Sequence, residues 1–139
     1  MSEEQLVREA NERFYRAMNA ADAEQMDAVW SGVATDVCVH PGREAIFGYE
    51  RIRESFAMIF SAENSMSIVA SNEHIVIHEE IAWVACTETI SIMMEDGLDA
   101  AAAQATNIFQ RTNGAWRMVV HHASPIPFTT QDDWPDVIN

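Results

Sequence analysis

The sequence predicts an α+β domain in which three helices come first and a meander of antiparallel strands follows. Two successive patterns of apolar residues along the chain predict this fold class. Apolar residues recur at a helical spacing of three and four as far as about residue 61, and from Ser65 onward they alternate with a period of two. The length of 139 residues suits one domain with its own core. We therefore expect a single domain over residues 1–139, with the helices on one face of the sheet.

Three helices are expected in the first half of the chain. The first begins after Ser2, which forms a capping-box pair with Gln5. The second begins after Asp22, a residue type that caps helix N-termini, and its apolar stripe stops at Gly32. The third spans about 49–61, where apolar residues again follow the helical period.

Strands are expected where the apolar period is two. A short β-prone stretch at 36–40 precedes the third helix. The alternation that starts at Ser65 changes phase further on, which predicts a β-bulge near 71–73. The segment 81–94 is the second long strand, and the turn residues at 96–97 follow it.

The last part of the sheet is predicted to contain a tight hairpin. Asn113-Gly114 is a strong hairpin signal, and it joins the preceding strand to a strand over 116–122. The alanine run at 100–103 has helix propensity. The proline-containing tail at 125–139 is expected to be extended and non-regular, because proline cannot donate to a strand ladder.

Composition excludes several kinds of partner and chemistry. The chain has 22 acidic and 8 basic residues, a formal net charge of −14, and no run of positive charge. Nucleic acids and anionic membranes are therefore not expected as partners. All 8 basic residues are arginine, which excludes Schiff-base lysines and phosphate-binding lysines. The N-terminus has no basic stretch followed by an apolar one, so we expect a cytoplasmic protein.

The cysteines are expected to be reduced and buried. Cys38 and Cys86 each lie in an apolar run, where a thiol usually packs as a small hydrophobic group, and neither belongs to a CxxC pair. A metal site would need His40, Glu88 and His122 to converge, and no local spacing supports it. We therefore expect no metal and no other cofactor.

Three strings resemble the SnoaL-like branch of the nuclear transport factor 2-like superfamily. They are "VCVHPGREAIFGYERIRESFAMIF", "AWVACTE" and "ATNIFQRTNGAWRMVVHHASP", and the resemblance runs from about Val7 to Pro125. It implies a cystatin-like cone, in which a curved antiparallel sheet wraps around the helices, with a pocket at the wide end. It also implies a homodimer through the outer sheet face. Members of this superfamily include enzymes and proteins without catalytic activity, so the resemblance does not decide the function.

His40 is the first candidate catalytic residue. The resemblance places it where ketosteroid isomerases carry their catalytic aspartate, and a neutral imidazole can accept a proton at neutral pH. The oxyanion-hole tyrosine of those enzymes falls on Phe14 here, so ketosteroid isomerase activity is not predicted.

His121 and His122 are adjacent on a predicted strand, so they point to opposite faces of the sheet. His122 is in phase with Trp116 and matches the family's closing position. We therefore expect His122 to face the pocket and to be the second catalytic histidine, with His121 on the outer face.

Glu88 is a carboxylate within an apolar strand, where burial is costly unless the group is paired. Two interpretations are open. Glu88 is either an acid partner of a histidine, with a raised pKa, or the partner of Arg111 or Arg117 in an ion pair.

A set of further residues is expected to contact a ligand. Asn107 can donate and accept hydrogen bonds, and aromatic residues at suitable spacings are candidates for an apolar wall. The wall candidates are Phe14, Trp30, Phe56, Trp83 and Phe109.

Two functions remain open from the sequence. The first is a cofactor-free isomerase, dehydratase, cyclase or hydrolase that exchanges protons with a mostly apolar small molecule through His40 and His122. The alternative is a non-catalytic module that binds a ligand or forms a dimer.

Overall fold

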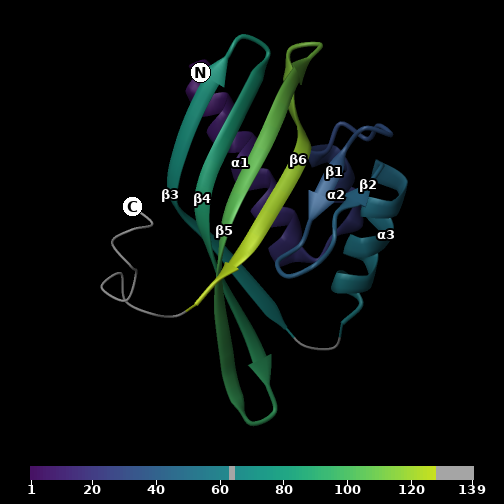
Figure 1. Cartoon of the computed structure of the whole chain (residues 1–139), viewed down its shortest axis with the longest axis vertical. Helices are drawn as coiled ribbons and strands as arrows, with labels where there is room; N and C mark the ends of the chain where they lie inside the picture. Colours follow the sequence, from purple (N-terminus) through teal and green to yellow (C-terminus); the bar gives the residue numbers. More distant parts are fainter. Residues whose placement is uncertain (63–64, 128–139) are drawn as a thin grey trace.

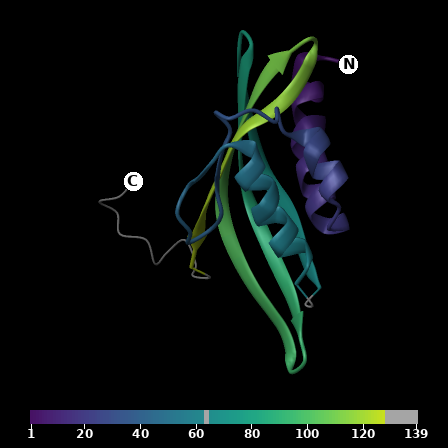
Figure 2. The same cartoon turned by 90° about the vertical axis from the view of Figure 1, so that its right-hand side faces the viewer.

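The computed structural model describes residues 1–62 and 65–127, and it has the predicted α+β architecture. Three helices cover one face of a curved sheet of six strands, and the β4–β5 hairpin extends beyond the helices (Figures 1 and 2). The strand order in the sheet is β2-β1-β6-β5-β4-β3. The elements are α1 (Glu3–Ala20), α2 (Ala23–Val29), β1 (Val37–Val39), β2 (Ile46–Phe47), α3 (Tyr49–Phe60), β3 (Met66–His78), β4 (Ile81–Met94), β5 (Gly97–Thr112) and β6 (Ala115–Ile126).

The helix starts follow the capping residues. Ser2 accepts from the Gln5 backbone N–H and the Gln5 side chain accepts from the Ser2 backbone, so the predicted capping box is confirmed. Asp22 caps α2 as expected. α2 ends before the predicted Gly32, because Trp30 turns into extended backbone and forms a parallel bridge to Met118 of β6.

The sheet is mixed rather than wholly antiparallel as predicted. β1 pairs in parallel with β6 and antiparallel with β2, whereas β3, β4, β5 and β6 form the expected antiparallel meander. A parallel pair requires a long connection, and the rest of the chain between β1 and β6 provides it. The bulge in β3 is confirmed by a register shift between Ser71 and His74.

Two segments near the C-terminal half differ from the prediction. The alanine run 100–103 belongs to β5 rather than to a helix, because strand neighbours on both sides override its weak local preference. β6 continues through Pro125 and Ile126, which the sequence places in the non-regular tail. Residues 128–139 of that tail lie outside the described residues.

A second bulge, which the sequence analysis did not predict, reverses the alternation within β6. Ile108 pairs with Val120 while Phe109 pairs with Met118, so Val119 is the extra residue. Met118 faces the helices before the bulge, and His121 faces them after it.

The core lies between the helices and the concave face of the sheet. Cys38 and Cys86 are free and buried there, as predicted. Within residues 1–62 and 65–127, no helix is long and apolar enough to cross a membrane.

Asp36 is a fully buried carboxylate that fixes the approach to β1. It accepts hydrogen bonds from the Ser31 hydroxyl and from the backbone N–H groups of Gly32 and Val33. These donors satisfy a group whose burial would otherwise be costly. The loop that leads into the strand before His40 therefore depends on this side chain.

Asp36→Ala should lower the free energy of unfolding by about 1–3 kcal/mol, because three donors lose their hydrogen-bond acceptor. Denaturant unfolding monitored by circular dichroism measures this loss. The matched control is Asp99→Ala at an exposed carboxylate in β5, which should cost less than about 0.5 kcal/mol. Equal losses in the two variants would contradict this role for Asp36.

Candidate functional site

His40 follows β1 directly and lies half-buried against α3. Its Nε2 lies 3.0 Å from the Ser55 hydroxyl oxygen, and that hydroxyl donates to the Ile52 carbonyl at 2.7 Å. Because the single hydroxyl proton of Ser55 is used in this way, Nε2 is the donor to Ser55. The other ring nitrogen, Nδ1, then carries a lone pair. The sulfur of Cys38 lies 3.9 Å from it.

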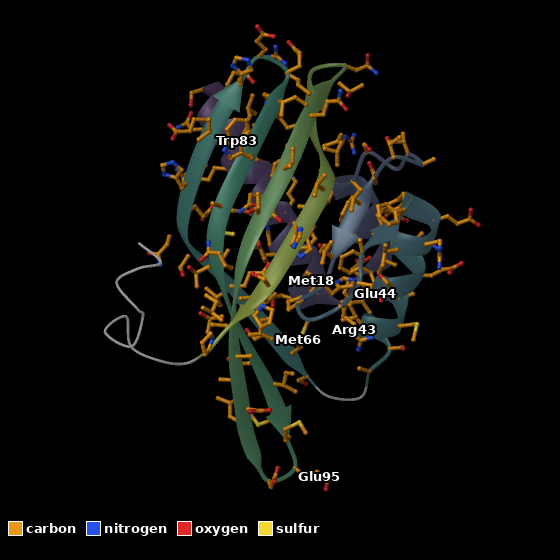
Figure 3. The ribbon with its side chains drawn as sticks, viewed as in Figure 1. Met18, Arg43, Glu44, Met66, Trp83 and Glu95 are labelled. Atoms are coloured by element: carbon orange, nitrogen blue, oxygen red, sulfur yellow. The ribbon has the colours of Figure 1, made fainter. Side chains whose placement is uncertain are left out.

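A cavity of about 670 Å³ lies beside this imidazole. Its walls are His40, residues 43–46 of the loop between β1 and β2, and one face of α3 that includes Ser55, Met58 and Ile59. Figure 3 shows Arg43 and Glu44 on this loop, next to α3. The volume lies within the range of small-molecule sites.

The surroundings of His40 keep its imidazole neutral. Burial lowers the pKa of His40, and the positive charge of Arg43 lowers it further. The ring of Phe56 meets the imidazole edge to face at 5.1 Å between centroids. At neutral pH, His40 is therefore in the form that can accept a proton.

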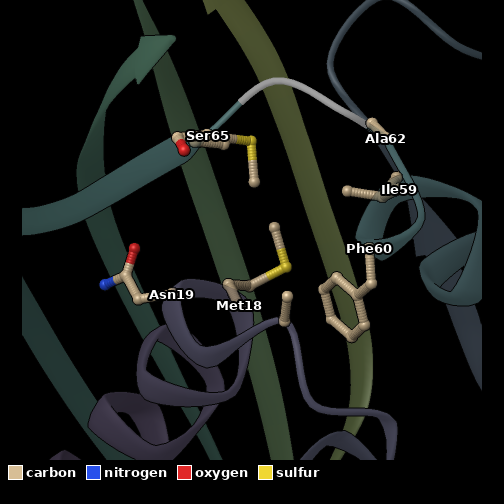
Figure 4. A pocket seen from close by; sticks show the side chains of 8 residues that line it. Met18, Asn19, Ile59, Phe60, Ala62 and Ser65 are labelled. Atoms are coloured by element: carbon tan, nitrogen blue, oxygen red, sulfur yellow. The ribbon is translucent and has the colours of Figure 1, made fainter. Parts of the chain in front are cut away.

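A second cavity of about 310 Å³ lies where α1, α3 and β3 meet. Figure 4 shows the side chains of Met18, Ile59 and Phe60 around it. Asn19 also lines it, but its amide is occupied by the backbone of Ile68, from which it accepts and to which it donates. Ile59 borders both cavities, so this residue of α3 separates the two.

Five side chains form a buried polar cluster between α1 and the sheet. Asn107 donates to Asn11 at 2.8 Å and to the Tyr15 hydroxyl at 3.0 Å, and its oxygen lies 2.6 Å from His121 Nδ1. The Tyr15 hydroxyl donates to Glu88 at 2.8 Å. We call Asn11, Tyr15, Glu88, Asn107 and His121 the buried polar cluster; none of the five lines either of the two cavities above.

Burial disfavours the charged forms of Glu88 and His121 at the centre of the cluster. Burial raises the pKa of Glu88, with the Tyr15 hydrogen bond acting in the opposite direction. Burial, together with smaller effects of the neighbouring His40 and His122, lowers the pKa of His121 to about 3. Because Nδ1 of His121 donates its proton to the Asn107 oxygen, Nε2 of the neutral ring carries the lone pair. This Nε2 atom lies 4.0 Å from a carboxyl oxygen of Glu88. Burial therefore favours the protonated carboxyl of Glu88 and the neutral imidazole of His121.

The structure reverses the predicted orientation of the two adjacent histidines. His121 is 3% exposed and stacks on Phe14 at 4.6 Å, whereas His122 lies exposed on the outer face. The reason is the extra residue Val119, which shifts the alternation after Trp116 by one position. His122 therefore does not face the side of the sheet on which His40 lies.

Two other predicted positions are also corrected. Trp83 is 38% exposed and lies on the outer face, because it is out of phase with the buried Val84 next to it. Glu88 does not pair with an arginine, since Arg111 binds Glu80 and Glu3 and Arg117 donates to the Ala28 carbonyl.

The remaining aromatic candidates lie on the inner side. Phe14 and Phe56 contact each other at 6.0 Å between ring centroids and pack against His121 and His40 respectively. Trp30 packs against Phe56 at 6.3 Å, and Phe109 is fully buried in the core. None of these four lines the cavity beside His40.

Sequence reasoning did not identify Asn11, Tyr15 or Ser55. Asn11 and Tyr15 are four residues apart on the buried face of α1, and a polar pair in an apolar helical stripe was the available signal. Ser55 lies on the same face of α3 as Arg51 and Ile59, because the three residues are spaced four apart. Within residues 1–62 and 65–127, no group of three metal-binding side chains converges.

Comparisons with known proteins identify the family and the fold. A family model described as a SnoaL-like domain matches residues 7–129. Among curated proteins, the F-box protein SKIP8 of Arabidopsis thaliana is 25% identical over 114 residues. The match covers 82% of this chain and 47% of that protein, so the chain spans about half the length of this relative.

Two solved structures resemble the chain along most of its length. A candidate dehydratase of the NTF2-like family from Streptomyces avermitilis has a TM-score of 0.82 and 29% identity, covering 89% of this chain and 96% of that one. A candidate calcium/calmodulin-dependent protein kinase type II association domain from Thiobacillus denitrificans has a TM-score of 0.72 and 28% identity, covering 85% and 93%. The fold is thus shared by proteins described in quite different terms.

The burial of His121 should make the free energy of unfolding depend on pH. An unfolded imidazole titrates near 6.5 and the folded His121 near 3, so the unfolded state binds more protons between these values. The contribution of His121 to the free energy of unfolding should therefore fall as pH falls below 6.5, by roughly 1 kcal/mol per pH unit.

His121→Asn should weaken this dependence, and His122→Asn at the exposed neighbour should retain it. Denaturant unfolding of each variant at about pH 7 and about pH 5 gives the change in its free energy of unfolding with pH. If His122→Asn flattens the slope and His121→Asn does not, then His121 is not the buried histidine of the pair.

Proposed function

Because the chain belongs to the SnoaL-like domain family, we propose that it binds a small molecule beside His40 and that His40 accepts a proton from it. The observation that carries this proposal is a neutral imidazole at the wall of a cavity of about 670 Å³, with one nitrogen held by Ser55 and the other carrying a lone pair. The geometry favours a reaction that needs only proton transfer, namely an isomerisation or the elimination of water.

In this reaction, Nδ1 of His40 takes a proton from a carbon or oxygen atom of the substrate, and the ring becomes an imidazolium. The same ring then returns the proton to another atom of the substrate, or to the hydroxyl that leaves as water. Ser55 fixes the ring by accepting from Nε2 in both protonation states. The low pKa of His40 favours the return of the proton.

Glu88 and His122 are not assigned a part in this step. Glu88 is 1% exposed within the buried polar cluster and lines neither cavity. His122 lies on the opposite face of the sheet from the His40 cavity. We propose that Glu88 and Asn107 are positioning residues that hold His121 neutral behind the aromatic wall formed by Phe14.

His40→Asn should slow proton transfer by about 100-fold or more, because a positioned general base typically contributes a factor of this size. Candidate carbonyl compounds that raise the melting temperature are incubated with the protein in D2O, and deuterium incorporation is followed by mass spectrometry. His78→Asn at an exposed histidine is the control. Binding compounds that never exchange or eliminate would overturn the catalytic proposal.

The rate should also fall as pH drops through a value below 6.5, since His40 must be unprotonated and its pKa is lowered. The titratable or charged groups that lie near His40 or line the same cavity are Cys38, Arg43, Glu44, Arg51 and His121. Of these, burial raises the pKa of Cys38 to about 12, so its thiol stays neutral. An NMR titration of the His40 ring gives the same pKa independently of any substrate.

A second function, association through the sheet, is supported by a different observation. Residues paired directly across strands lie on the same face, and one such row crosses all six strands. Its members are all apolar: Val76, Trp83, Ile108, Val120, Val37 and Phe47. Trp83 is 38% and Phe47 64% exposed. We propose that this outer apolar row is covered by the same row of a second copy in a two-fold dimer.

Trp83→Glu should convert the dimer into a monomer, because a charge at the centre of an apolar interface would lose its hydration. Sedimentation equilibrium measures the mass. Met58→Glu introduces the same charge at a side chain that is 75% exposed on the helical side, and it should leave the dimer intact. A monomeric wild type, or a dimer that survives Trp83→Glu, would contradict this interface.

A further inference from the structure

We propose that the ligand of the His40 cavity is amphiphilic: an anionic oxygen group, carboxylate or phosphate, binds between Arg43 and Arg51, and an apolar body contacts Met58 and Ile59. This inference rests on the proposed small-molecule site and adds the chemical class of the molecule that fills it.

The first support comes from the partners of the arginines. The chain has 8 arginines among 22 acidic residues, so carboxylates are abundant. The guanidinium groups of five arginines have a partner within the protein. Those of Arg8, Arg13, Arg53 and Arg111 bind carboxylates, and that of Arg117 donates to a backbone carbonyl. Within residues 1–62 and 65–127, only Arg16, Arg43 and Arg51 make no such hydrogen bond or ion pair. Two of these three line the same cavity.

The backbone places these two arginines on opposite sides of that cavity. Arg43 lies on the loop, in a turn closed by its own N–H, which donates to the His40 carbonyl at 3.0 Å. Gly42 supplies the positive φ of 75° in this turn. Arg51 lies in the first turn of α3. The cavity lies between this loop and this helix.

The face of α3 that carries Arg51 explains the apolar half of the ligand. Ser55, Met58 and Ile59 follow Arg51 at intervals of four, seven and eight residues, so they share one helical stripe. The stripe begins with a guanidinium, passes the hydroxyl that holds His40, and ends with two apolar side chains. A ligand along this stripe meets a charge at one end and hydrocarbon at the other.

Glu44 is the one acidic side chain that lines the cavity. Among the described residues, it forms no ion pair with either arginine within 4.0 Å. Two guanidinium groups and one carboxylate give the cavity wall a net charge of +1, in a chain whose formal net charge is −14. A single anionic group neutralises this local excess, and a guanidinium binds planar or tetrahedral oxyanions with two parallel hydrogen bonds.

The experiment uses three probes of equal chain length with the whole protein: octanoate, octyl phosphate and the neutral octanamide. Isothermal titration calorimetry should detect binding of at least one of the two anions, at least about tenfold tighter than octanamide. The anion that binds more tightly shows whether the site prefers a carboxylate or a phosphate headgroup. Equal affinity for all three probes, or no binding of either anion, would overturn the inference.

Arg43→Gln and Arg51→Gln should each weaken binding of the anion by about tenfold and leave octanamide unaffected. Arg53→Gln is the matched control, because Arg53 lies two residues from Arg51 on α3 but pairs with Asp27 outside the cavity. An equal loss in Arg53→Gln would mean that general surface charge, and not this site, attracts the anion.

His40→Asn separates this inference from the proposed reaction. The variant should bind the anion within about twofold of the wild type while losing proton transfer. If the proton-transfer proposal fails, the arginine dependence of binding remains. If the anion inference fails, octanoate and octanamide bind alike while the exchange that depends on His40 remains. A large loss of anion binding in His40→Asn would contradict the assignment of the anion to the two arginines.

Discussion

The carboxamide of Asn107 connects the three elements on which the interior depends. Its two N–H groups donate to Asn11 and Tyr15 of α1, and its oxygen accepts from His121 of β6, while the residue itself belongs to β5. A buried amide without partners would be costly, and here each of these polar groups has one. Because hydrogen bonds are directional, this side chain fixes how α1 lies on the concave face, which apolar packing alone does not do.

The same cluster provides hydrogen-bond partners for two buried titratable groups, Glu88 and His121. Tyr15 donates to Glu88, and Asn107 accepts the proton of His121 Nδ1 in a hydrogen bond, so neither group needs a countercharge. Burial raises the pKa of Glu88 and lowers that of His121 to about 3. His40 differs because it lies half-buried beside a cavity, where a ligand can reach it.

Local signals in the sequence were sufficient for much of the fold. The capping box at Ser2, the bulge near Ser71 and the Asn113-Gly114 hairpin each depend on residues close in sequence, and the structure contains all three. The bulge at Val119 has no such signal, since the run around it is apolar and fits either phase equally well. That one residue decides which of two adjacent histidines is buried. The prediction of His122 as the inner histidine was wrong for this reason.

The two candidate functions use opposite faces of one sheet. Because successive side chains along a strand point to opposite faces, the residues proposed for each function are different. Cys38 faces inward next to His40, whereas Val37 beside it belongs to the outer apolar row. Substitutions on the outer row therefore leave the polar contacts of the inner side in place. This separation agrees with the range of similar structures, which includes a candidate dehydratase and a candidate association domain. The two proposed functions therefore do not exclude each other, because the proposed proton transfer and the proposed dimer use different side chains.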